Sequence, residues 1–70
     1  MIRQPVQSSN IKSVGYDSQN KTLEVEFKSG GIFQYHNVNE DAHKNLLNAD
    51  SIGSHFHKNI KSNYGSTKIK

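Results

Sequence analysis

Four lysines follow the last acidic residue of the chain, and their spacing favours contact with an anionic partner. No Asp or Glu follows Asp50, and the four lysines beyond it are Lys58, Lys61, Lys68 and Lys70. On a helix, Lys58 and Lys61 would share one face with His57. Ammonium groups so placed can bind successive backbone phosphates of RNA or of another phosphate-bearing ligand. A solvated, solubilising face would carry the same charges without a ligand.

Small hydroxyl residues precede these lysines at the expected start of a helix. Ser51, Gly53 and Ser54 lie where free backbone N–H groups and two hydroxyls could hold a phosphate. Ordinary capping of the helix by a hydroxyl explains the same residues without a ligand. A small phosphorylated nucleotide held at this segment is therefore one functional alternative.

Aromatic residues on neighbouring strands are the third feature that could bind a ligand. Phe33 and Tyr35 fall on one face of a predicted strand, and Tyr16 and Phe27 fall on the strands before it. A solvent-facing arrangement would stack unpaired bases, whereas a face turned toward helices would simply be core. We take Tyr16 and Tyr35 as the residues for base or ribose contact, because a phenol hydroxyl favours water or a partner.

Neither a metal site nor a catalytic site is expected. His55 and His57 are two residues apart, so on a helix they point about 200° away from each other. Glu24 and Glu26 share a strand face and could form an acid–base pair, but they equally fit a solvated face. No serine lies in a nucleophile-elbow context. We therefore expect a protein that is not an enzyme and has no cofactor.

Three short segments show the patterning of β-strands. They cover residues 11–16, 22–28 and 32–38, separated by a polar turn at 17–21 and a glycine turn at 29–31. The middle segment is the clearest, because Leu23, Val25 and Phe27 alternate with polar residues. These segments predict an antiparallel meander with one apolar face.

The pattern then changes to that of helices. Asn39 is placed to cap a first helix, and Asp50 or Ser51 a second. In the second helix the apolar residues recur every four positions as far as a stop at Gly65, and they are Ile52, Phe56, Ile60 and Tyr64. The order predicts the α+β class: a three-stranded antiparallel meander followed by two helices packed on one face (β-β-β-α-α). We expect one domain over 1–70, with 1–9 as an extended lead-in and 66–70 as a basic, frayed tail.

Composition limits the remaining choices. Seventy residues with 31% hydrophobic content form one small domain, whose core we expect to join Leu23, Val25, Phe27, Leu46, Phe56 and Ile60. The absence of cysteine excludes a disulfide scaffold, and no apolar run approaches a membrane span. We expect a cytoplasmic location. The small core, and a segment 32–38 with few charges at the sheet edge, favour self-association.

The order of the motifs resembles the KTSC domain over roughly residues 6–64. The matching segments are Ser8-Ser9-Asn10-Ile11, Val14-Gly15-Tyr16-Asp17, Leu23-Glu24-Val25-Glu26-Phe27, Gly30-Gly31, Phe33-Gln34-Tyr35, Ala49-Asp50-Ser51-Ile52-Gly53 and the stretch 56–64. The family takes its name from the C-terminus of some lysyl-tRNA synthetases and also occurs alone in bacterial and phage proteins. The resemblance implies RNA binding as the suggested role. Phe33, Asn39 and His57 stand where the family commonly has Tyr, Pro and Asn.

The sequence thus predicts a non-enzymatic module that binds RNA or another phosphate-bearing ligand through a basic C-terminal helix and tail. The expected ligand-binding residues are Tyr16, Tyr35, Ser51, Gly53, Ser54, His57, Lys58 and Lys61. The alternatives are a protein-interaction or self-associating module, such as a phage-encoded inhibitor of a host protein, and a protein that sequesters small nucleotides.

Overall fold

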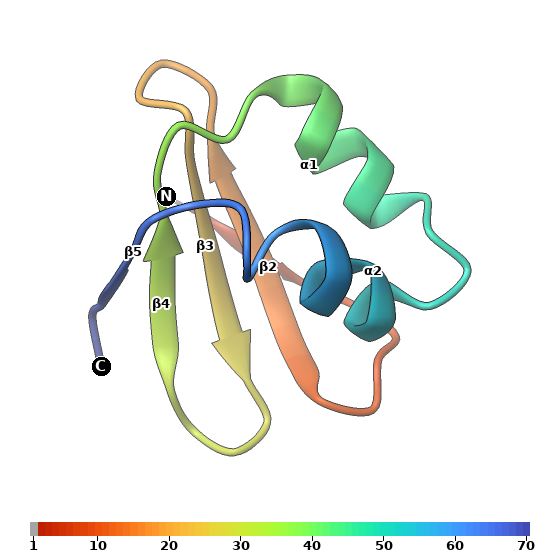
Figure 1. Cartoon of the computed structure of the whole chain (residues 1–70). Helices are drawn as coiled ribbons and strands as arrows, with labels where there is room; N and C mark the ends of the chain where they lie inside the picture. Colours follow the sequence, from red (N-terminus) through yellow and green to blue (C-terminus); the bar gives the residue numbers. More distant parts are fainter. Residues whose placement is uncertain (1) are drawn as a thin grey trace.

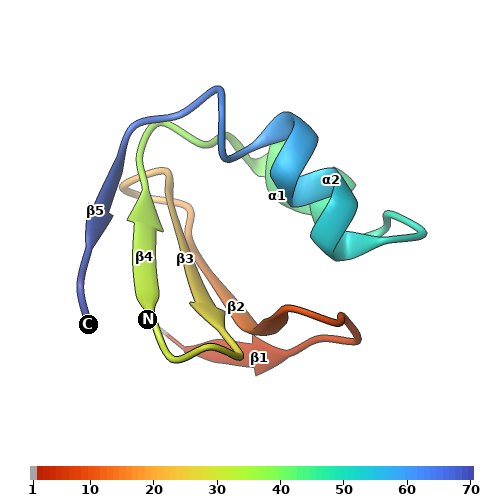
Figure 2. The same cartoon turned by 60° about the horizontal axis from the view of Figure 1, so that its bottom comes forward.

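Five antiparallel strands form one sheet in the order β1-β2-β3-β4-β5, and two helices cover one of its faces (Figures 1 and 2). The computed structural model describes residues 2–70. The elements in chain order are β1 (Arg3–Pro5), β2 (Ile11–Asp17), β3 (Thr22–Phe27), β4 (Ile32–Tyr35), α1 (Glu40–Leu47), α2 (Ile52–Asn59) and β5 (Ser66–Lys68). Within this described part of the chain, neither helix is long and apolar enough to span a lipid bilayer.

The central meander β2–β4 follows the pattern predicted from the sequence. Leu23 and Val25 of β3 are fully buried on the face that the helices cover. In the β2–β3 turn, the carboxylate of Asp17 accepts hydrogen bonds from the backbone N–H groups of Gln19 and Asn20, at 3.1 and 3.4 Å. Gly30, in the β3–β4 turn, has a φ of 114°, which only glycine adopts readily. Local turn chemistry therefore sets both hairpins.

The sheet has five strands, so the prediction of a three-stranded meander was incomplete. Segments 1–9 and 66–70, which were expected to be an extended lead-in and a frayed tail, each contribute an edge strand. β1 pairs with β2, and β5 pairs with β4. Both strands have three residues and are largely exposed, so they lack the alternation that reveals a buried strand. Because β5 pairs with residues 33–35, β4 is not the edge of the sheet, and the expected exposed edge at segment 32–38 is corrected. Self-association itself stays a prediction.

The two helices begin where the sequence predicted. The side chain of Asn39 accepts a hydrogen bond from the N–H of Ala42 at 2.9 Å, and Ser51 accepts one from Ser54 at 3.3 Å.

The second helix ends five residues earlier than its apolar spacing predicted. The side-chain amide of Asn63 donates to the backbone carbonyl of Asn59 at 2.9 Å, and that of Asn59 donates to the carbonyl of His55 at 3.2 Å. Such side-chain bonds compete with helical backbone bonds and end α2 at Asn59. The chain then turns back to place β5 beside β4, as the blue segment in Figure 1 shows.

The core lies between the sheet and the helices, with Phe56 of α2 at its centre. Its ring packs edge-on against Phe27 and Tyr35, with centroid distances of 5.5 and 5.2 Å. The predicted core is confirmed, although Phe27 is only partly buried. The sequence missed Ile11, Val14 and Val38, and it left open whether Tyr35 belongs to the core; all four are at least 96% buried.

Candidate ligand-binding groove

Three adjoining hollows run along one side of α2, and we call them together the α2 groove. The first, of about 250 Å³, lies at the start of α2 and is lined by Ser9, Asn10, Ser51, Gly53, Ser54, His57 and Lys58. The second, of about 410 Å³, shares Ser9, Asn10 and His57 with it and adds Phe27, Lys28, Ser29, Phe56 and Lys61. The third, of about 390 Å³, shares Phe27 and Lys61 with the second and adds Phe33, Tyr35 and Ser66. Because neighbouring hollows share lining residues, each one adjoins the next along the surface.

The α2 groove is basic and lacks acidic lining residues. Lys28, Lys58 and Lys61 line it with His57, and all four side chains are exposed. Within residues 2–70, no Asp or Glu lines any of its three hollows. Lys68 of β5 adds to this charge, because it lies opposite Phe33 and so on the same face of the sheet. A phosphate entering the groove meets only positive or neutral groups.

Seven of the eight predicted ligand-binding residues line the groove, namely Tyr35, Ser51, Gly53, Ser54, His57, Lys58 and Lys61. The sequence missed Lys28, Ser9 and Asn10, which belong to turns far from α2 along the chain. Helical spacing finds only neighbours on one helix, whereas these three reach the groove through the fold. The sequence signal that could have identified this side of the groove is the pair Ser9-Asn10 before β2, which also belongs to the segments that resemble the family.

Gly53 brings the start of α2 into contact with the loop at residues 8–10. A Cβ built on Gly53 would overlap Oδ1 of Asn10 and would lie 3.1 Å from Oγ of Ser8. The loop is held in shape because the Ser8 hydroxyl donates to Asn10 Oδ1 at 3.0 Å and accepts from the Ile11 N–H at 3.3 Å. Gly53 therefore permits the close packing that forms the first hollow.

Tyr16 lies outside the groove, so the structure does not bring this predicted ligand-binding residue together with the lysines. It lines a separate hollow of about 450 Å³ between β2 and α1. Its ring stacks on His43 with a centroid distance of 4.5 Å, and its hydroxyl donates to the carbonyl of Val38. Burial, with the nearby charges of Glu40 and Asp17, raises the pKa of the phenol. Tyr16 thus fastens α1 and the segment before it to the sheet.

Tyr35 does reach the groove, but its ring is not a stacking platform. The residue is only 4% exposed, and Phe56 packs edge-on against its ring. Burial raises the pKa of its hydroxyl. Phe33, which is partly buried and lines the same hollow, is the more accessible aromatic side chain. The prediction that Tyr35 stacks on a base is therefore corrected in favour of Phe33.

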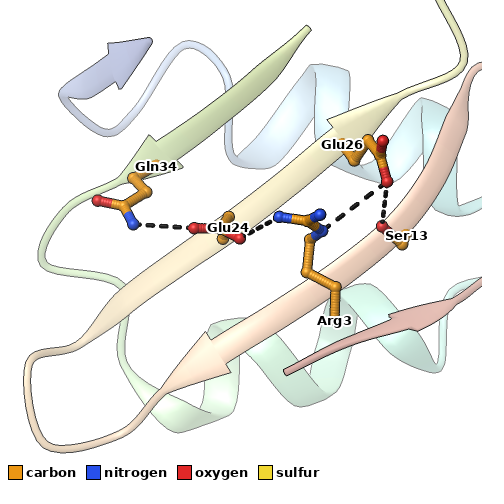
Figure 3. Close-up of polar contacts among 5 residues, drawn as sticks. All are labelled: Arg3, Ser13, Glu24, Glu26 and Gln34. Atoms are coloured by element: carbon orange, nitrogen blue, oxygen red, sulfur yellow. Dashed lines mark hydrogen bonds and ion pairs between the residues drawn. The ribbon is translucent and has the colours of Figure 1, made fainter. Parts of the chain in front are cut away.

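A second polar cluster lies on the opposite face of the sheet and engages both carboxylates of β3 (Figure 3). Arg3 reaches from β1 across β2, where Gly15 has no side chain, and forms an ion pair with Glu24. Its Nε lies 3.8 Å from Oε1 of Glu26, which also accepts a hydrogen bond from Ser13 at 3.0 Å.

This cluster changes how the two carboxylates are interpreted. Gln34 donates to Glu24 at 2.9 Å, and this bond, together with Arg3, lowers the pKa of Glu24 against the opposing effect of burial. Glu24 is 8% exposed, so the expected solvated face is wrong at this position. Both carboxylates are held by partners within the fold, and through Arg3 they fix β1 on the sheet.

The histidines lie apart from one another. His36 contacts the hydroxyl of Thr67 at 2.9 Å, His43 stacks on Tyr16, and only His57 lines the groove. Among residues 2–70, no three His, Asp or Glu side chains gather closely enough to hold a metal ion.

Comparisons with known proteins agree on one family. The model of the KTSC domain matches residues 7–64. The crystal structure of a KTSC domain protein from Yersinia pestis is 45% identical, has a TM-score of 0.95 and covers 99% of this chain and 97% of that one. An uncharacterized protein of Stutzerimonas stutzeri is 44% identical over 61 residues, which are 87% of this chain and 86% of that protein. A lysine–tRNA ligase of Nostoc punctiforme is 38% identical over 58 residues, which are 83% of this chain but 10% of the ligase.

Proposed function

This chain belongs to the KTSC domain family, and we propose that it is a non-enzymatic module that binds RNA, or another phosphate-bearing polymer, in the α2 groove. One observation carries the proposal: the groove collects three lysines and a histidine and has no acidic lining residue within residues 2–70. The molecule has six acidic residues, so their absence from this surface separates positive from negative charge. Such a surface attracts a polyanion over a distance.

Each part of the groove has a distinct role in this proposal. Lys58 and Lys61 stand on one side, on α2 and just after it, and Lys28 stands on the other, at the end of β3. A strand lying between them is contacted from both sides. The hydroxyls of Ser9 and Ser54 and the amide of Asn10 supply neutral hydrogen bonds to phosphate or ribose. These contacts position a backbone and carry no base sequence information.

The relatives support RNA as the polymer. A region similar to this chain forms about a tenth of proteins named lysine–tRNA ligase, and tRNA is part of that name. We propose that RNA is also the ligand of this chain. A cytoplasmic location belongs to the same proposal, because RNA is abundant there.

The test is a fluorescence-anisotropy titration with short RNA and DNA at several salt concentrations. Four lysine–phosphate contacts, from Lys28, Lys58, Lys61 and Lys68, give a slope of log K against log salt of roughly −3 for single strands. The double variant Lys58→Ala/Lys61→Ala should weaken binding of every sequence equally and flatten the slope by about 1.4.

The matched control removes the same charge elsewhere. Lys12 and Lys44 are exposed and lie outside the groove, so Lys12→Ala/Lys44→Ala should leave most of the slope intact. Equal effects of the two double variants would assign binding to net charge alone and reject the groove. The absence of any binding tighter than millimolar at about 50 mM salt would reject the function itself.

A further inference from the structure

The third hollow of the α2 groove differs in chemistry from the other two. Three of its five lining residues are aromatic, namely Phe27, Phe33 and Tyr35, and the others are Lys61 and Ser66. The first hollow has no Phe or Tyr side chain, and serine and asparagine supply most of its lining. At about 390 Å³, the third hollow falls within the usual range of small-molecule pockets. Its shape and lining fit a planar apolar group with polar edges.

Tyr35 places a hydroxyl at this hollow. The residue is 4% exposed and lines the hollow together with Ser66 of β5, which lies opposite it in the strand register. Burial raises the pKa of this hydroxyl. A phenol O–H can both donate and accept a hydrogen bond, so it can bond the polar edge of a base.

Phe33 supplies an aromatic wall. It meets Phe27 edge-on, with ring centroids 5.8 Å apart and planes at 77°, so Phe27 does not cover its face by stacking. Phe27 is in turn fixed by Phe56, at 5.5 Å. Both rings are partly buried and belong to adjacent strands of the hairpin, so the wall is held by the sheet.

We propose that this hollow binds one unpaired nucleobase of a strand whose neighbouring phosphate contacts Lys61. Lys61 lines both the second and the third hollow, so it joins the backbone path to the base site. The base lies against Phe33, and its polar edge bonds the hydroxyl of Tyr35 or Ser66. Bases of a duplex are paired and stacked and do not enter, so the ligand is single-stranded. This inference rests on the proposed function and narrows it.

The test compares a single-stranded RNA with an abasic strand of the same length and charge at one salt concentration. Stacking of a base on an aromatic residue predicts that the intact strand binds about 5- to 150-fold more tightly. Phe33→Leu keeps an apolar side chain on the partly buried wall but removes the ring, and it should erase most of this difference while leaving the salt slope unchanged. Tyr35→Phe removes only the hydroxyl and should reduce the difference in part.

Leu47→Ala is the control, because this exposed apolar residue lies on α1 beside a different hollow. It should preserve the preference for the intact strand. If the unaltered protein binds intact and abasic strands equally, the base site is wrong while phosphate binding stands. If it binds neither strand, the proposed function fails, and the base site fails with it.

Discussion

At the scale of single residues, Gly53 shows how one missing side chain shapes the candidate site. In an open helix a glycine weakens the structure, and alanine in its place adds roughly 0.5–1 kcal/mol of stability. At this position the added Cβ would overlap Asn10 Oδ1, and the loop at 8–10 is held by its own hydrogen bonds. The structure identifies the loop at 8–10 as the segment that this glycine contacts.

We predict that Gly53→Ala lowers the free energy of unfolding by about 1–3 kcal/mol, because it overpacks this contact. Urea unfolding measures the change. Gly65→Ala is the control, since a Cβ at Gly65 meets no atom within 4 Å, and it should change stability by less than about 0.5 kcal/mol. An increase in stability for Gly53→Ala would show that the loop does not press against α2.

Glu24 is the residue whose charge matters most to the sheet. Its pKa in the folded state lies below its ordinary value of 4.5, because Gln34 and Arg3 bond the ionised form. A lowered folded pKa means that ionised Glu24 stabilises the fold above pH 4.5 and that this contribution is lost as the pH falls through the folded value.

Glu24→Gln should therefore be less stable than the unaltered protein at neutral pH and should lose less stability on acidification below pH 4.5. Urea midpoints measured across a pH series give both quantities. Asp50→Asn changes an exposed carboxylate instead and should leave the acid dependence nearly unchanged. Parallel pH curves for Glu24→Gln and the unaltered protein would contradict the role assigned to Glu24.

At the scale of elements, β5 protects β4 as well as extending the sheet. Its register places Lys68 opposite Phe33 and Ser66 opposite Tyr35, and the His36 N–H donates to the Gly65 carbonyl at 2.9 Å. Without β5, a strand with two aromatic residues would become an edge with unpaired backbone groups. Such edges promote pairing between molecules.

We therefore predict that a variant ending at residue 65 forms oligomers at concentrations at which the full chain keeps a constant mass. Sedimentation velocity of the two proteins at equal concentration measures this difference. The variant should also lose cooperativity in thermal unfolding, since β4 keeps only one strand partner. An unchanged mass and an unchanged melting curve would show that β5 contributes nothing to the sheet.

Comparison of elements explains what the sequence could and could not predict. β3 could be predicted because Leu23 and Val25 are buried on one face and alternate with polar residues. α1 could be predicted because Asn39 caps it and two acidic residues follow the cap. The end of α2 could not be predicted, because Tyr64 continues the apolar spacing although the helix ends at Asn59. Edge strands such as β1 are fixed by contacts with distant partners, which periodicity does not register.

At the scale of the whole molecule, Phe56 joins the sheet and helix layers. Its ring contacts aromatic residues of β3 and β4 from α2, and it is 2% exposed. We predict that Phe56→Ala lowers the free energy of unfolding by about 3–5 kcal/mol, which is most of the stability of a small domain. A cooperative variant that loses less than about 1 kcal/mol in urea unfolding would contradict this layering.

The candidate site was partly predictable for the same reason as the fold. Residues on α2, such as Lys58, follow from helical spacing, and they line the groove. Lys28 and Phe33 were not assigned to it, because the β3–β4 hairpin brings them to α2 only after folding. The face on which Tyr35 lies was predicted, but its burial depends on Phe56, which packs from another layer.

The most direct test of phosphate binding in the α2 groove is a map of backbone amide shifts in the isotope-labelled protein during titration with a short single-stranded RNA. We predict the largest shifts at groove residues such as Asn10, Gly53 and Lys61, with the opposite sheet face around Glu24 and Gln34 unchanged. These shifts should decline together as salt is added. Shifts centred on the opposite face, or none with RNA in excess, would contradict the assignment of the groove.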